Sequence, residues 1–143
     1  MSPALSMEVD RNGLEVLDRQ ECLRLLATGT IGRIGLTMEA LPVVLPINFR
    51  LVDDRIVFLT GVGSKLDAAA ANAIVSFEVD DFDPMAHTGW SVVVTGATCE
   101  VTDAERQSAL HWARVPRWAP AGDARYVEIA TDRISGRRIT HER

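Results

Sequence analysis

The segment from Thr60 to Lys65 carries the residue types that most clearly suggest chemistry. It reads Thr-Gly-Val-Gly-Ser-Lys and lies between an apolar stretch and an alanine-rich one, so it is expected to join a strand to a helix. Glycines permit close backbone approach, and a helix N-terminus offers unpaired N–H groups with a partial positive charge. Ser64 adds a hydroxyl, and Lys65 is the single lysine beside 14 arginines. These features predict a phosphate site, with an ordinary capped helix after a glycine turn as the alternative.

The order of these residues excludes a nucleoside-triphosphate P-loop. Such a loop ends in Gly-Lys-Ser or Gly-Lys-Thr, whereas this chain has Gly63-Ser64-Lys65 and its first glycine is misplaced. An ATPase or GTPase is therefore rejected.

A second segment of interest is the apolar, proline-interrupted run from Leu41 to Phe49. Pro46 has no N–H to donate to a ladder, so the groups beside it, at Ile47 and Asn48, could face a planar ligand. The Asn48 amide offers both a donor and an acceptor. The alternative is a prolyl bulge on an edge strand.

Tryptophans form the third signal. Trp90, followed by Ser91, opens a long apolar strand, and Trp118 stands in a later irregular stretch. Indole rings can wall a flat heteroaromatic ligand, although most tryptophans are simply core residues.

Nucleophiles and metal-ligating residues are not grouped in this sequence. His87, His111 and His141 have no ligand-like spacing, and the two cysteines, Cys22 and Cys99, are far apart in apolar settings. Both are interpreted as free buried thiols. The sequence therefore predicts no catalytic side chain and no metal site.

The bulk composition indicates one globular domain in a reducing compartment. The 143 residues are 47% hydrophobic and 24% charged, and the net charge of −5 gives no reason to expect a nucleic-acid partner. No apolar run approaches the roughly 20 residues needed to cross a bilayer. The N-terminus lacks the basic start and apolar core of a signal peptide. A cytoplasmic protein without membrane contact is expected.

Several helices and strands are expected to position these residues. Capping boxes predict helices over 18–28, ended by Gly29, and from 102–105 to about 114, and Ser64 is expected to cap a helix over 65–71. Residues 80–89 are predicted to be an acidic loop and 116–122 an irregular stretch. Strands are predicted over 30–37, 41–51, 55–60, 73–79, 90–101, 126–130 and 134–139.

Short turns between these strands favour antiparallel pairing, with the first three in a meander. The sum is a mainly β fold of six or seven strands with two or three short helices, which favours a small barrel over a doubly wound sheet. Residues 1–13 are expected to be a flexible arm, and residues 14–143 the single domain.

Taken in order, these segments resemble the pyridoxamine 5′-phosphate oxidase-like family. The closest branch resembles small actinobacterial flavin-nucleotide-binding proteins related to nitroimidazole-resistance proteins, over about residues 14–140. The segments that carry the resemblance are Gly32-Arg33-Ile34-Gly35, the run from Leu41 to Phe49, Gly63-Ser64-Lys65-Leu66, Val75 to Asp80, and Gly89 to Gly96.

The resemblance implies an antiparallel split β-barrel that forms a homodimer and holds FMN at the dimer interface. By position, the isoalloxazine ring would be lined by Pro46, Ile47, Asn48 and Phe49. Thr60 and Gly61 would follow the ribityl chain, and Ser64 and Lys65 would bind the phosphate. Trp90 and Ser91 would lie near the ring, and Trp118 would be a contact from the partner subunit.

The chain also departs from the oxidase pattern. Ser64 stands where the oxidase has a second basic residue, Trp90 stands where it has arginine, and the C-terminal Arg-x-His signature is absent. The resemblance thus implies the fold and a flavin more strongly than pyridoxamine-phosphate oxidation. An FMN-dependent oxidoreductase acting on a small molecule is expected, and a flavin carrier or sensor without turnover is the alternative. Arg33, Arg50 and Arg55 keep a third option open, the acidic deazaflavin F420, and haem is a remote fourth.

Overall fold

A computed structural model describes residues 8–116 and 122–139, in which there are nine strands and three helices. In chain order they are β1 (Glu15–Leu17), α1 (Arg19–Thr28), β2 (Ile31–Met38), β3 (Leu41–Asn48), β4 (Arg50–Val52), β5 (Arg55–Gly61), α2 (Lys65–Ala69), β6 (Ile74–Asp83), β7 (Thr88–Glu100), α3 (Ala104–Trp112), β8 (Ala124–Ile129) and β9 (Arg133–Ile139).

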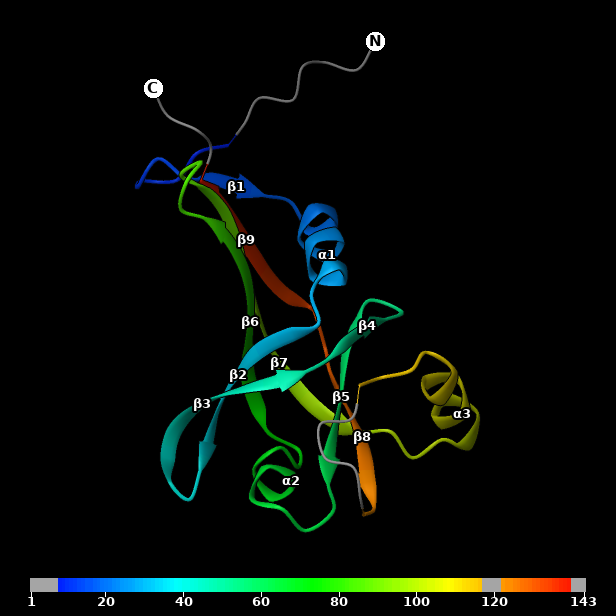
Figure 1. The fold of residues 1–143 in the computed structure, drawn as a ribbon. Coiled ribbons are helices and arrows are strands. Elements are labelled where there is room, and N and C mark those ends of the chain that lie inside the picture. The colour runs from blue at the N-terminus through cyan, green and yellow to red at the C-terminus, as the bar shows by residue number, and fades with distance from the viewer. Residues whose placement is uncertain (1–7, 117–121, 140–143) are drawn as a thin grey trace.

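The strands form one strongly curved sheet in which every pair is antiparallel. The order is β3-β2-β6-β7-β8-β5-β4, and β9 pairs with β7 and with β1. The two ends of this order, β3 and β4, are consecutive in the chain, so the sheet curls back on itself without closing (Figure 1). The mainly β, split-barrel prediction is confirmed.

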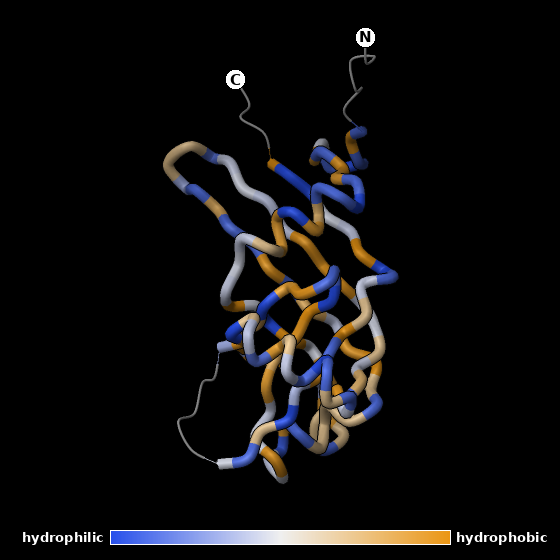
Figure 2. Tube along the Cα trace, turned by 90° about the vertical axis from the view of Figure 1, so that its right-hand side faces the viewer, coloured by the Kyte–Doolittle hydropathy of each residue, from blue (hydrophilic) through white to orange (hydrophobic). Residues whose placement is uncertain are grey.

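The core fills the inside of this curl. Along β2, exposed Ile31 and Arg33 alternate with buried Gly32 and Ile34. Hydrophobic and hydrophilic residues alternate in the same way along other strands (Figure 2). Gly32 is required by packing, because a Cβ at this position would lie 2.2 Å from Cζ of Phe77.

The predicted strand over 41–51 is two strands that meet at Phe49. Its first part, β3, pairs with β2, and its second part, β4, pairs with β5. The Phe49 ring is 1% exposed and meets Phe77 edge-on, with 4.9 Å between ring centroids. The predicted three-strand meander is therefore wrong, because anchoring Phe49 in the core sends the two hairpins to different parts of the sheet.

The predicted acidic loop over 80–89 is mostly strand. β6 continues to Asp83 and β7 begins at Thr88, so only a tight turn separates them, and the hairpin extends toward the end of the molecule that carries β1 (Figure 1). The carboxylates of this segment are exposed, as is every residue over 80–87, so both faces at this end of the hairpin are open to solvent. The acidic residues and Pro84 favoured a loop prediction, whereas pairing with β7 extends strand β6 to Asp83.

The helix predictions are largely confirmed. Asp18 caps α1 by accepting from the amide of Glu21 at 2.8 Å, and Gly29 follows its last residue. Ser64 caps α2, which ends at Ala69 and is shorter than expected. The cap of α3 is Asp103, whose carboxylate accepts from the amide of Arg106, and not the first residue of the predicted capping box.

The N-terminal region contains structure that the sequence reading did not anticipate. Strand β1 pairs with β9, and the Asp10 carboxylate accepts from the amide of Leu14 at 2.9 Å and forms an ion pair with Arg137. Residues 1–7 of the proposed arm lie outside the described residues. Cys22 is buried as predicted, but Cys99 is exposed, because it lies on the outward face of β7.

Candidate functional site

The predicted phosphate loop joins β5 to α2. The hydroxyl of Ser64 accepts from the amide of Asp67 at 3.0 Å. The Lys65 ammonium lies 3.2 Å from a carboxylate oxygen of Glu39, in the turn between β2 and β3, and the two side chains are 77% and 68% exposed. An ion pair so open to water contributes little stability, so the ammonium is available to a stronger anionic partner.

Asp67 organises this loop from within. Its carboxylate accepts from the Thr60 hydroxyl at 2.8 Å and from the Gly63 amide at 2.9 Å, and Arg125 approaches both oxygens at 3.1 and 3.2 Å. The hydrogen bond from Gly63, followed by those from Thr60 and Arg125, lowers the pKa of this carboxyl against the opposing effect of burial. Asp67 was not among the predicted site residues, although Ser-x-x-Asp has the spacing of a capping box.

These bonds decide which donors remain for an anion. The amides of Val62, Gly63 and Ser64 already donate within the chain, to Asp123, Asp67 and Gly61. Among the described residues, the amides of Lys65 and Leu66 have no acceptor, as expected for the first turn of a helix. The loop therefore offers two amides, the Ser64 hydroxyl and an ammonium on its exposed side.

Thr60 and Gly61, at the end of β5, precede the loop and differ in their exposure to solvent. Thr60 is buried and its hydroxyl is held by Asp67, whereas Gly61 is exposed. A Cβ built on Gly61 meets no atom of the described residues within 4 Å, so no described side chain covers the end of β5.

The predicted ring-lining segment lies on β3, at the edge of the sheet. Pro46 is exposed on the outward face, Ile47 packs against the core, and Asn48 is half-buried opposite Ile31. Phe49 is in the core, so any contact from this position to a surface ligand comes from its backbone.

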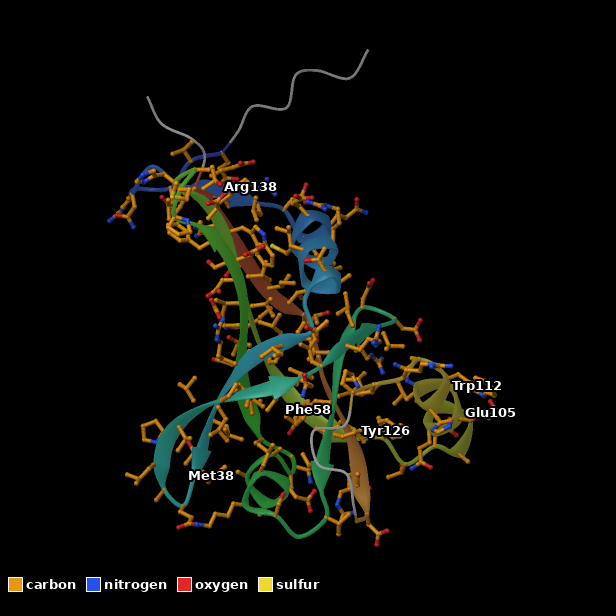
Figure 3. All side chains as sticks on the ribbon, in the orientation of Figure 1. Met38, Phe58, Glu105, Trp112, Tyr126 and Arg138 are labelled. Carbon is orange, nitrogen blue, oxygen red and sulfur yellow. The ribbon has the colours of Figure 1, made fainter. Side chains whose placement is uncertain are left out.

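Trp90 and Ser91 lie at the other end of the sheet from the loop. They project to opposite faces of β7, with Trp90 level with Arg138 and Ser91 level with Asp80. Figure 3 shows Arg138 near one end of the molecule and Met38, beside the β2–β3 turn that Lys65 reaches, near the other. One chain thus does not bring these two residues to the loop, and Trp118 lies outside the described residues.

An acidic pair on the outward face of the sheet was also missed. The guanidinium of Arg33 lies 3.3 Å from Glu78 and 3.1 Å from Asp80. Burial, with a hydrogen bond and a like charge from Asp80, raises the pKa of Glu78 to about 7. The pKa of Asp80 is lowered, chiefly by the hydrogen bond from Glu78. Arg33 is directly opposite Pro46, so this cluster adjoins the proposed ring position.

Within the described residues, no helix has the length and apolar character needed to span a membrane. The same part of the chain contains no group of three or more histidine, cysteine, aspartate or glutamate side chains arranged to hold a metal ion.

Proteins of related sequence and structure identify the family to which this chain belongs. An uncharacterised protein of Mycobacterium tuberculosis is 38% identical over 97% of this chain and 95% of its own length. A solved FAD-binding protein of Mycobacterium smegmatis is 34% identical, with a TM-score of 0.77 over 87% of this chain and 99% of that one. A FAD-binding protein of Mesorhizobium loti is 25% identical, with a TM-score of 0.71 over 89% and 99% of the two chains. The family model described as pyridoxamine 5′-phosphate oxidase matches residues 18–138, and the chain belongs to this family.

Proposed function

We propose that this protein binds a flavin nucleotide, with the FMN phosphate at Ser64 and Lys65. The observation that carries the proposal is the set of donors on the exposed side of the loop: two free amides, a hydroxyl, and an ammonium held only by a solvent-exposed partner. A phosphate dianion accepts from all of these groups. The two FAD-binding proteins of similar fold support a flavin as the ligand.

Different residues of the chain would contact the phosphate, the ribityl chain and the ring of the flavin. Asp67 fixes the loop so that its free donors point outward, and Lys65 exchanges Glu39 for the phosphate. Thr60 and Gly61 follow the ribityl chain. The ring lies on the outward face of β3, against Pro46 and the backbone of 47–49. A bound flavin supplies electron or hydride transfer, and the protein supplies position and electrostatics.

A second copy of the chain would complete the site. Trp90 and Ser91 are at the far end of the sheet from Lys65, so they reach a shared ring only from a partner subunit. Three apolar side chains on the outward face of the sheet are also exposed: Ile31 by 49%, Val44 by 70% and Ile74 by 71%. Contact of this apolar surface with water is unfavourable, and a second subunit would cover it. These features support a homodimer with the flavin between its subunits.

Turnover of a small molecule with FMN is the activity proposed, and a carrier or sensor is the competing one. Steady-state oxidation of reduced nicotinamide by the flavin-loaded protein separates them. F420 stays the alternative cofactor. Arg33 is paired with Glu78 and Asp80 and Arg55 with Glu128 at 3.2 Å, whereas Arg50 forms no ion pair with any described residue.

The direct test is the visible spectrum of the purified protein before and after addition of FMN. Wild type should show the two-band spectrum of bound flavin. Lys65→Glu should lose it, because the substitution places a like charge against the phosphate. Arg11→Glu, with the same change of charge at an exposed position near the other end of the sheet, should bind as wild type does. Equal binding by the Lys65 variant would refute the phosphate role.

A further inference from the structure

A separate hollow of about 480 Å³ lies against α3, on the other side of β5 from α2. Its volume falls within the range of small-molecule sites. Figure 3 shows that Trp112 comes from α3 and Tyr126 from the neighbouring strand β8. The lining residues are Leu59, His111, Trp112, Arg114, Val115 and Tyr126.

The walls of this hollow suit a flat aromatic ring. The Trp112 indole is 77% exposed, which is unusual for the largest apolar side chain. Tyr126 and Leu59 pack against the small core formed by Val57, Val101, Leu110 and Val115, which gives the hollow a rigid apolar floor. A planar base stacked on the indole would cover this exposed surface.

The charges around the hollow suit a ligand that carries phosphate. Among the described residues its lining has no carboxylate, and it includes the Arg114 guanidinium and the His111 imidazole. Arg114 adopts φ 58° just after the helix, and its guanidinium makes no ion pair with any residue in the described parts of the chain. A second hollow, of about 400 Å³ beside Trp90, is lined by two carboxylates, Asp81 and Asp83, with one cation, Arg138, so its charge is less favourable to an anion.

The wall that carries Trp112 is fixed to the barrel. Arg106 of α3 donates to the buried Glu128 carboxylate of β8 at 2.8 and 3.0 Å, and it also pairs with Asp53 in the β4–β5 turn. The helix is therefore held in place before any ligand binds. This preorganisation lowers the entropy cost of binding.

Within the described residues, the end of β5 joins the hollow to the phosphate loop over a short distance. Leu59 and Tyr126 are opposite each other in the β5–β8 ladder, and Gly61 lies two residues farther along β5. Two strand residues span about 7 Å. The ladder ends at Gly61, where no side chain projects, and the amide of Ser64 lies 3.0 Å from the Gly61 carbonyl oxygen.

We infer that this hollow binds the adenine of a flavin adenine dinucleotide whose FMN half occupies the Ser64–Lys65 site. The adenine stacks on Trp112, Arg114 attracts the pyrophosphate, and the linking atoms pass over Gly61. The inference rests on the proposed function and adds to it a preference for FAD over FMN.

The test is to titrate the full chain with FMN and with FAD, following flavin absorbance, for wild type, Trp112→Ala and Trp112→Phe. Wild type should bind FAD at least about tenfold more tightly than FMN, because stacking of one base contributes roughly this factor or more. Trp112→Ala should remove this preference and leave FMN affinity unchanged, and Trp112→Phe should restore most of it. AMP should compete with FAD and not with FMN.

The outcomes separate the two proposals. If FMN binds and the ratio of FAD to FMN affinity is the same in wild type and Trp112→Ala, the adenine site is wrong and the phosphate site stands. Competition of AMP with FMN would likewise refute a separate adenine site, because AMP would then occupy the FMN phosphate position. If neither flavin binds to wild type, the proposed function fails and this inference fails with it.

Discussion

Two clusters on this barrel pair carboxylates with an arginine, and they differ in how the charges are balanced. At the start of α2, the carboxylate of Asp67 receives bonds from Thr60, Gly63 and Arg125, and the more exposed Glu100 contacts Arg125 from outside. On the outward face of the sheet, Glu78 and Asp80 share Arg33. The pKa of Asp67 is lowered in the first cluster, whereas in the second the pKa of Glu78 is raised and that of Asp80 is lowered.

This difference indicates that the Asp67 cluster has a structural role and that the Glu78 cluster can exchange protons. A carboxylate with enough donors stays ionised and fixes its neighbours in place. Glu78 is partly buried and has the like charge of Asp80 beside it, and together these raise its pKa to about 7 against the attraction of Arg33. Asp67 thus shapes the proposed phosphate loop, whereas Glu78 lies beside the proposed ring as a group able to give or take a proton.

The largest expected effect is that of Asp67→Ala. The side chain is 11% exposed, and its removal leaves the Thr60 hydroxyl and the Gly63 amide without their acceptor and Arg125 with Glu100 as its remaining carboxylate partner. We expect a loss of about 2–4 kcal/mol in the free energy of unfolding and a fall in FMN affinity of more than about tenfold, since the loop loses its internal support. Chemical denaturation and FMN titration measure the two effects.

The matched control for this change is Glu100→Gln, which removes the outer partner of the same arginine. Glu100 lies 3.3 Å from Arg125 and its side chain is 44% exposed. This variant should change stability by less than about 0.5 kcal/mol and leave FMN binding intact. If both variants behave alike, the distinction between a buried organising carboxylate and an exposed one is lost.

A smaller effect is expected from titration of Glu78. Its pKa is higher in the folded protein, at about 7, than in the unfolded chain, so folding binds a proton between these two values. Stability should therefore be highest below about pH 4.5 for this group and should fall as the pH rises through 7. Allowing for solvent screening, the loss between pH 5.5 and 8 is about 1 kcal/mol.

Asp80 does not contribute to this window. Its pKa is lowered, so the stability it contributes is present above its ordinary value and is lost only at acidic pH. Glu78→Gln should flatten the dependence of the denaturation midpoint on pH between 5.5 and 8. Glu105→Gln, an exposed change on α3, should leave the slope as in wild type. A slope unchanged in the Glu78 variant would assign the titration to another group.

The features that could be predicted from the sequence are those that depend on neighbouring residues in the chain. The strands, the antiparallel barrel and the caps at Asp18 and Ser64 were read from alternation and short-range spacing, which are local properties of the chain. The break at Phe49 and the pairing of Asp67 with Arg125 depend on residues brought together by the fold. No local pattern in the sequence specifies such contacts.

Charge clusters were the least predictable feature of the candidate site. Arg33 is 45 residues from Glu78 in the chain, and the two meet only because β2 and β6 are neighbours in register. The sequence identified Arg33 as an available cation, whereas the fold neutralises it. A basic residue is available to a ligand only after the carboxylates on the strand beside it are known.

The smallest effect is expected where a carboxylate neither supports the loop nor shares a proton, which is the case for Glu39. Its pair with Lys65 is exposed, so Glu39→Gln should change the free energy of unfolding by less than about 0.5 kcal/mol. The same change removes the anion that competes with the phosphate for the ammonium, so FMN affinity should rise about two- to threefold at low salt and less at high salt. Titration with FMN at two ionic strengths measures this gain, with Glu105→Gln again as the exposed control. A loss of FMN affinity in the Glu39 variant would mean that Glu39 positions Lys65 for the ligand and does not compete with the phosphate. The Glu39–Lys65 pair would then be, like the bonds of Asp67, one of the contacts that shape the loop.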